Sequence, residues 1–213
     1  METIAVIDFE SNGEAASQGG RATEIAVVLV RAGRIIDRYH NLMRTDSWIS
    51  PFVVELTGIT NEMMQSAPPA RRVMTEARAF VGSLPMVAHH ASFDSLFWHS
   101  EIERLGEPAP KNEFACTMLL ARRVYPSSPN HKLGTLSRLL KFTTSSPAHR
   151  AMVDTEMAAN LLTRIQDSLR SRHGLLEAPH ALLAAAQKIP KQHFQARLPA
   201  LALRMGVPHR LVG

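Results

Sequence analysis

The segment Ile4-Ala-Val-Ile-Asp8-Phe-Glu10 constrains this chain most, because a short apolar run meets two carboxylates there. Such a run predicts a buried strand. Side chains two residues apart on a strand point to the same side, so Asp8 and Glu10 share one face. Two like charges about 5–7 Å apart repel by roughly 2–3 kcal/mol at an effective dielectric near 20. A bound cation such as Mg²⁺ would relieve this repulsion; solvation of both acids is the alternative.

Composition limits what the whole chain can be. Its 213 residues, 45% of them hydrophobic, suffice for one ordinary domain with a real core. No apolar run approaches the roughly 18 residues of a membrane span, and the N-terminus lacks the basic start of a signal peptide. The single cysteine, Cys116, excludes an internal disulfide and is typical of a reducing compartment. We therefore expect a cytoplasmic protein without a membrane partner.

The positive charge is concentrated near the end of the chain. Residues 1–163 hold 16 Lys and Arg against 17 Asp and Glu, whereas residues 164–213 hold 8 against 2. A basic segment on a near-neutral body suggests a polyanionic partner.

The order of elements predicts an α/β fold with a mixed sheet. Strands near 4–10, 24–30 and 34–42 are separated by a short turn at Gly33 and by a Gly- and Ser-rich loop, so the chain opens as an antiparallel meander. Helices then alternate with shorter strands. We expect helices from Pro51 to Gly58, after Pro69, from Ser92 to Gly106, over Met118–Val124, around Leu133–Leu140 and from about Arg150 to about Ser171, with a strand over Pro85–His90.

The composition changes beyond Gly174, where Pro190 and Pro199 separate short helical patterns. We therefore divide the chain into a domain over residues 1–173 and a basic helical C-terminal extension over residues 174–213. The apolar spacing within the extension favours packing on the domain. Docking of a DNA polymerase or another protein, and contact with backbone phosphates, are the alternatives.

Two further carboxylates stand at the ends of elements. Asp94 lies in the first turn of a helix that follows a strand, and Asp154 lies early in the long helix among apolar residues. His149 precedes Asp154 by five residues, a turn of roughly 500° on a regular helix, so the two cannot share a helix face. If both serve one site, His149 must precede the helix. Four converging carboxylates would require divalent cations, which support in-line phosphoryl chemistry.

Three stretches resemble the motifs of the DEDDh 3′→5′ exonucleases, the family that includes the DNA polymerase III epsilon proofreading subunit. Asp8-Phe-Glu10 resembles the first motif, His89-His90-Ala-Ser-Phe93-Asp94 the second, and His149-Arg-Ala-Met-Val-Asp154 the third. Glu55–Thr60 and His131–Leu133 also look like segments of this family, and the resemblance spans about residues 4–166.

The resemblance implies an RNase H-like fold and an enzyme that uses two Mg²⁺ or Mn²⁺ ions. It implies that Asp8, Glu10, Asp94 and Asp154 are the metal ligands, with Asp8 bridging both ions. His149 would be the general base. Arg150 stands where tyrosine-type relatives carry Tyr, so the histidine branch is the one matched.

The resemblance also suggests contacts to substrate. Ser11, Asn12 and Gly13 follow the first motif, where relatives commonly have Thr-Thr-Gly, and the backbone of this turn would hold the terminal 3′-hydroxyl. Gly58 and Ile59 would line the pocket for the terminal nucleotide, with core packing as the alternative for Ile59. His90 stands where Asn is usual and is a further candidate.

These implications lead to a functional hypothesis. We expect an exonuclease that releases nucleoside 5′-monophosphates from single-stranded or frayed 3′ ends of DNA, in replication proofreading or repair. Trimming of RNA 3′ ends is the alternative within the enzyme class. A non-catalytic subunit that binds nucleic acid or a polymerase is the alternative outside it.

Overall fold

A five-stranded mixed sheet forms the centre of the protein, in the strand order β3-β2-β1-β4-β5. The computed structural model describes residues 2–142 and 150–209. The first three strands pair antiparallel, whereas β4 and β5 add parallel to β1, which confirms the predicted mixed sheet. The strands are β1 (Thr3–Ser11), β2 (Ala22–Arg31), β3 (Arg34–Leu42), β4 (Met86–Ala88) and β5 (Phe114–Cys116). The sequence did not predict β5, because its three residues follow the polar stretch Lys111-Asn112-Glu113 and no longer apolar run marks them.

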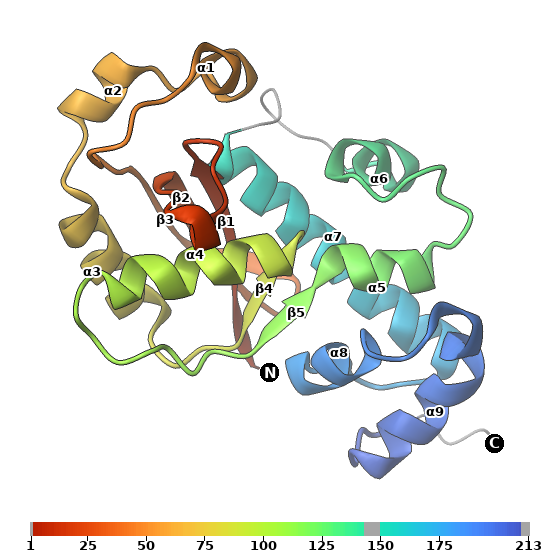
Figure 1. Cartoon of the computed structure of the whole chain (residues 1–213). Helices are drawn as coiled ribbons and strands as arrows, with labels where there is room; N and C mark the ends of the chain where they lie inside the picture. The colour runs from red at the N-terminus through yellow and green to blue at the C-terminus, as the bar shows by residue number, and fades with distance from the viewer. Residues whose placement is uncertain (1, 143–149, 210–213) are drawn as a thin grey trace.

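Helices flank this sheet on both sides (Figure 1). They are α1 (Pro51–Thr57), α2 (Asn61–Ser66), α3 (Ala70–Val81), α4 (Ala91–Glu103), α5 (Thr117–Val124), α6 (Leu133–Leu140), α7 (Ala151–His173), α8 (His180–Ala186) and α9 (Phe194–Arg204), with 3₁₀ turns η1 (Ala16–Gln18) and η2 (Lys191–His193). In the described part of the chain, none of these helices has the length and apolar character needed to cross a membrane.

The helix α1 shows how local sequence sets its bounds. The Ser50 hydroxyl accepts a hydrogen bond from the Val53 amide, Pro51 occupies the first helical position, and Gly58 closes the helix with φ +71°. An N-cap serine satisfies an amide that the helix leaves unpaired, and glycine adopts a left-handed φ without strain. The predicted start and end of this helix are therefore confirmed.

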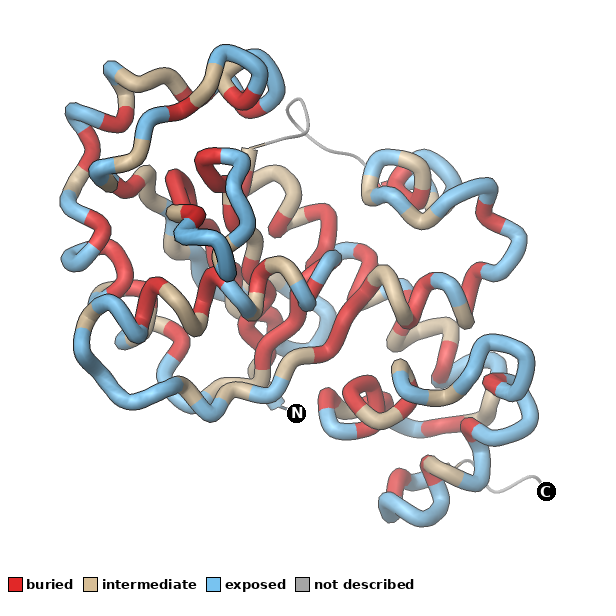
Figure 2. Tube along the Cα trace, in the orientation of Figure 1, coloured by how far each residue is buried: buried red, intermediate tan, exposed pale blue. Residues whose placement is uncertain are grey.

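Strand β1 is buried on both faces, which explains its continuous apolar run. Ile4 and Val6 pack into the core that contains α7. Ala5 and Ile7 pack into the core that contains α3 and α4. Figure 2 shows the resulting band of buried residues through the centre of the molecule. Because side chains alternate along a strand, the next even-numbered residue, Asp8, also faces α7.

The described part of the C-terminal extension packs against the domain, as its apolar spacing predicts. The side chains of Leu182, Leu183, Phe194 and Leu198 are buried in the same core as Ile4 and α7. The boundary at residue 173 itself stays a prediction.

One side chain of the extension completes the open edge of the sheet. The Cys116 amide donates a hydrogen bond of 2.7 Å to the Gln187 Oε1 atom, and Gln187 Nε2 donates one of 3.1 Å to the Phe114 carbonyl. The carboxamide thus takes the place of a neighbouring strand beside β5. Unpaired groups on an edge strand are a site for unwanted pairing, so this contact protects the edge.

We predict that Gln187→Leu lowers the free energy of unfolding by about 1–3 kcal/mol, because two backbone groups of β5 lose their partners. Urea unfolding measures the effect. The matched control is Gln192→Leu at an exposed position of η2, which should change stability by less than about 0.5 kcal/mol. Equal stability of the two variants would show that Gln187 does not support the sheet edge.

Candidate active site

Three carboxylates from two distant parts of the sequence meet at the C-terminal end of β1. One oxygen from each of Asp8, Glu10 and Asp154 lies within 4.8 Å of the other two, and all three residues are half-buried. The strand carries Asp8 and Glu10 on the face that α7 covers, and α7 contributes Asp154 from its first turn. The packing of α7 on β1 therefore brings together three of the four predicted metal ligands.

The fourth predicted ligand, Asp94, borders this cluster. It lies in the first turn of α4, is 1% exposed, and accepts a 3.2 Å hydrogen bond from the Phe9 amide, between Asp8 and Glu10. Burial raises the pKa of Asp94, although its bond to the Phe9 amide opposes this shift. Asp94 is not among the three residues whose oxygens lie within 4.8 Å of one another.

Burial and mutual repulsion disfavour the charged forms of the cluster. Burial, and then the charges of Asp94 and Asp154, raise the pKa of Asp8 well above its usual range. Burial, and then the Asp154 charge, raise the pKa of Glu10 to about 7, while Arg150 acts in the opposite direction. Closely spaced carboxylate oxygens are the ligands that Mg²⁺ and Mn²⁺ prefer. The residues present therefore fit divalent cations.

A fully buried acid, Glu24 of β2, anchors the start of α7. Its carboxylate accepts hydrogen bonds of 2.8 to 3.3 Å from the Arg150 guanidinium and one of 3.0 Å from the Ala151 amide. The Nε2 atom of His40 lies 2.7 Å from the same carboxylate. Arg150 directly precedes the helix and Ala151 is its first residue, so these contacts fix the helix start.

The charge of Glu24 is stable despite its burial. Burial alone would raise its pKa, but hydrogen bonds from His40, Arg150 and Ala151 lower the pKa to about 2. The ionised Glu24 therefore holds α7 in place three residues before Asp154. The apolar pattern around Glu24 predicts only that this residue lies in a strand. One feature of the sequence could have indicated this role: Glu24 is a charged residue at the start of a strongly apolar strand. An acid that is buried there requires hydrogen-bond or charge partners.

The predicted general base, His149, lies outside the described residues. The helix α7 begins at Ala151 after an extended Arg150, and the role of His149 stays a prediction.

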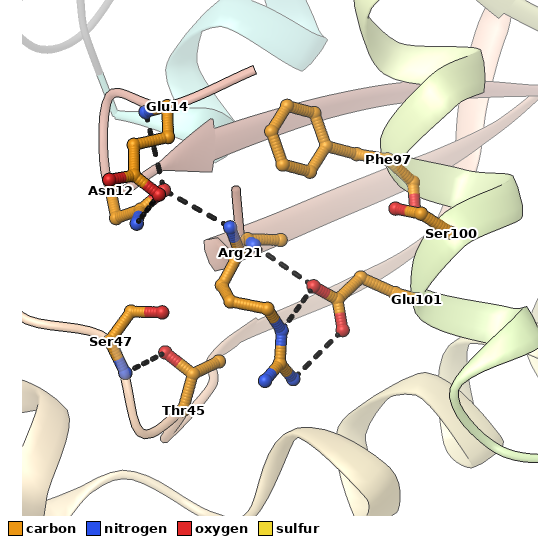
Figure 3. Close-up of polar contacts among 9 residues, drawn as sticks. Asn12, Glu14, Arg21, Thr45, Ser47, Phe97, Ser100 and Glu101 are labelled. Carbon is orange, nitrogen blue, oxygen red and sulfur yellow. Dashed lines mark hydrogen bonds and ion pairs between the residues drawn. The ribbon is translucent and has the colours of Figure 1, made fainter. Parts of the chain in front are cut away.

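The predicted substrate residues Ser11 and Asn12 form hydrogen bonds within their own loop. The Ser11 hydroxyl accepts a bond of 3.2 Å from the Gly13 amide. Asn12 Oδ1 accepts bonds from the amides of Glu14 and Arg21, at 3.4 and 3.1 Å (Figure 3). These side chains therefore shape the turn that follows the acidic strand.

The same loop is tied to α4 and packed against α1. The Arg21 guanidinium donates two hydrogen bonds, of 2.9 and 3.1 Å, to the buried carboxylate of Glu101, as Figure 3 shows. Gly13 has φ +93°, and a Cβ atom there would lie 2.7 Å from Val53 Cγ2. Only glycine therefore allows α1 to lie this close to the loop.

The remaining predicted substrate residues occupy different environments. Ile59 is fully buried in a small core with Ile49, Val53 and Met64, so its side chain supports this region from within. Gly58 is exposed at the end of α1. His90 is exposed before α4, with its ring parallel to that of Phe93 at a centroid distance of 6.4 Å. Their contacts to substrate stay predictions.

The sequence matches the RNase_T exonuclease family over residues 5–162, which includes every carboxylate described above. This chain belongs to the DEDDh 3′→5′ exonuclease family. The match covers β1, α4 and the start of α7, the elements that carry the acidic cluster.

Relatives and solved structures of this exonuclease family support the assignment. The chain is 36% identical over 162 residues to DNA polymerase III PolC-type of Halalkalibacterium halodurans, covering 76% of this chain and 11% of that protein. It is 30% identical over 200 residues to 3′-5′ exonuclease DinG of Bacillus subtilis, covering 94% and 21%. The chain thus spans about a tenth to a fifth of these proteins. The structure resembles that of Exonuclease X in complex with 5′ overhanging duplex DNA, with 30% identity and a TM-score of 0.64, covering 85% and 99% of the two chains.

We predict that Glu10→Gln stabilises the metal-free exonuclease above neutral pH. The raised pKa means that the folded wild type binds this proton more tightly than the unfolded chain, so stability is lost as pH rises through about 7. The loss is on the order of 2–3 kcal/mol. In EDTA, the variant should therefore exceed the wild type in stability near pH 8 and match it near pH 4.

Urea unfolding at both pH values tests this prediction. Excess Mg²⁺ should stabilise the wild type more than Glu10→Gln. The control is Glu103→Gln, at an exposed position of α4 outside the cluster, which should leave the pH dependence unchanged. The same pH dependence in Glu10→Gln and the wild type would contradict a raised pKa at Glu10.

We also predict that Glu24→Gln loosens the start of α7. The change removes charge-assisted hydrogen bonds and should lower the free energy of unfolding by about 2 kcal/mol. It should also weaken Mn²⁺ binding measured by titration calorimetry, because Asp154 follows the loosened segment. The matched control, Glu156→Gln, breaks an exposed ion pair of α7 with Arg38 and should cost under about 1 kcal/mol. Unchanged Mn²⁺ affinity in Glu24→Gln would rule out this positioning role.

Proposed function

We propose that this protein removes nucleoside 5′-monophosphates from single-stranded or frayed 3′ ends of DNA, using two Mg²⁺ or Mn²⁺ ions. One observation carries the proposal: Asp8, Glu10 and Asp154 form a tight acidic cluster in a chain that belongs to the exonuclease family. DNA is the favoured substrate, because the relatives include DNA polymerase III PolC-type and the similar Exonuclease X structure contains duplex DNA.

In the proposed mechanism, Asp8, Glu10 and Asp154, with Asp94 beside them, would hold the cations. When bound, divalent cations lower the pKa of water and stabilise negative charge on phosphate oxygens. A ring nitrogen of His149 takes the proton from the attacking water, which requires a neutral imidazole. Glu24 keeps α7 and Arg150 in place while this occurs. The loop after β1 orients the 3′ end of the strand.

Two alternatives have different consequences. Trimming of RNA would require that the active site accommodates the ribose 2′-hydroxyl. A non-catalytic subunit would bind nucleic acid or a polymerase without shortening the strand. The packing of the described extension against the domain favours a structural role for that segment over docking of a polymerase.

We predict that the purified protein shortens a 5′-labelled single-stranded DNA from its 3′ end in Mn²⁺ and leaves it intact in EDTA. Asp8→Ala and Asp154→Ala should abolish this activity, since each removes charge that holds metal. His149→Ala should lower the rate by about 10²–10⁴-fold with metal binding largely intact. Gel analysis of labelled products measures all three effects.

A matched RNA oligonucleotide and the variant His193→Ala, at an exposed site in η2, are the controls. Faster degradation of RNA than of DNA would show that RNA is the preferred substrate, contrary to the proposal. Binding of the oligonucleotide without any shortening would favour the non-catalytic alternative, and full activity in His149→Ala would remove that residue from its role as base.

A further inference from the structure

Two long stretches of the sequence contain no acidic residue. Residues 114–153 hold six Lys and Arg without any Asp or Glu, and residues 178–213 hold five without any. All 19 Asp and Glu of the chain therefore lie elsewhere. A protein surface that carries charges of one sign attracts ligands of the opposite sign, so these stretches are candidates for contact with a polyanion.

The fold joins the two stretches at the C-terminal end of α5. Arg123 Nε donates a 2.6 Å hydrogen bond to the Ile189 carbonyl of the extension. Arg172 of α7 reaches the same end of α5, where its Nη1 atom donates a 2.6 Å bond to the Val124 carbonyl. Two lysines stand on either side of Ile189 in the sequence. We call the cations gathered here the α5 basic cluster, which consists of Arg122, Arg123, Arg172, Lys188 and Lys191.

The charges of the α5 basic cluster are not neutralised by the protein. None of the ion pairs within residues 2–142 and 150–209 includes a member of this cluster. Asp167, on the same helix as Arg172, pairs with Arg170 instead. All members except the half-buried Arg123 are exposed. Burial lowers the pKa of Arg123, and the charge of Arg122 lowers this pKa further. A bound anion would relieve this repulsion.

The α5 basic cluster lies apart from the candidate active site. The strands β1, β4 and β5 are parallel neighbours, so β5 ends at the same sheet edge as β1, about 10 Å away. The eight residues of α5 extend about 12 Å further, and Figure 1 shows this helix leading away from β1. The two clusters are therefore separated by on the order of 15–20 Å, or about five nucleotides of a stacked strand.

We propose that the α5 basic cluster is an accessory site for the phosphodiester backbone of a nucleic acid, about five nucleotides upstream of the 3′ end. Lys and Arg bind phosphates whatever the base sequence. The inference rests on the exonuclease function proposed above, because that function determines where the 3′ end lies. The same function favours a nucleic acid over an acidic segment of another protein.

The double variant Lys188→Gln/Lys191→Gln tests this surface. Both side chains are exposed, whereas Arg123 and Arg172 also bind backbone carbonyls and are left intact. In EDTA and about 0.1 M salt, fluorescence anisotropy should show that a twelve-nucleotide single-stranded DNA binds the variant about tenfold more weakly. The slope of the logarithm of affinity against the logarithm of salt concentration should fall by about 1.4, because two phosphate contacts are lost.

The matched control is Arg104→Gln/Lys111→Gln. It removes two exposed cations from the part of the chain that carries acids, so its net charge equals that of the test variant. This control should bind the twelve-nucleotide DNA as the wild type does. Equal weakening in both double variants would show that only net charge matters and would overturn the proposed site.

Substrate length separates the accessory site from the chemistry. In Mn²⁺, the Lys188→Gln/Lys191→Gln variant should raise KM for the twelve-nucleotide DNA about tenfold and leave kcat unchanged. Hydrolysis of the p-nitrophenyl ester of thymidine 5′-monophosphate should not change, because this substrate has no upstream phosphate. Slower hydrolysis of the ester would show that the variant disturbs the acidic cluster, which contradicts an accessory site.

Further outcomes distinguish the occupants and the two proposals. Tighter binding of a twelve-residue poly-L-glutamate than of the DNA, lost in the test variant, would replace the nucleic acid by an acidic protein segment. If the wild type hydrolyses both substrates and the test variant binds DNA normally, the accessory site is wrong and the exonuclease function stands. If the wild type hydrolyses neither substrate but only the test variant loses affinity for DNA, the exonuclease function is wrong and the phosphate-binding surface is supported.

Discussion

Repulsion among buried carboxylates is the constraint on which the rest of this structure depends. Asp8, Glu10 and Asp154 lie close together in a partly buried site, and Asp94 adds a further charge beside them. Such a cluster is stable only if protons or cations neutralise it. The fold therefore maintains an arrangement that is unfavourable for the protein alone and favourable once divalent cations bind.

Rigid elements oppose that repulsion. The acidic residues of β1 belong to a strand that is buried on both faces, and the strand cannot move without disrupting two cores. Asp154 belongs to a helix whose start is held by the ionised Glu24 through Arg150 and Ala151. The free energy that holds these like charges close together thus comes from packing and from one buried hydrogen-bond network outside the cluster.

Exposed aromatic and exposed basic side chains occur in different segments outside the cluster. Phe52 of α1 and Trp48 just before this helix are exposed, and Lys132, Arg138 and Lys141 are exposed in the segment that contains α6. A nucleic acid has the same two kinds of surface, because its bases are apolar rings and its backbone is anionic. Family membership accounts for the acidic centre.

The sequence by itself determined the mixed sheet, the bounds of α1 and the common face of Asp8 and Glu10, because period, capping and spacing act over a few residues. It also indicated the four acids, through motifs that resemble a known family. Only the tertiary structure decided which hydrogen-bond partners the polar side chains find in distant parts of the chain. Glu24 binds Arg150, which lies 126 positions away, and Gln187 binds the Cys116 amide at the edge of β5, 71 positions away. Local patterns indicate that a residue is buried, but the identity of its partner depends on how distant elements pack.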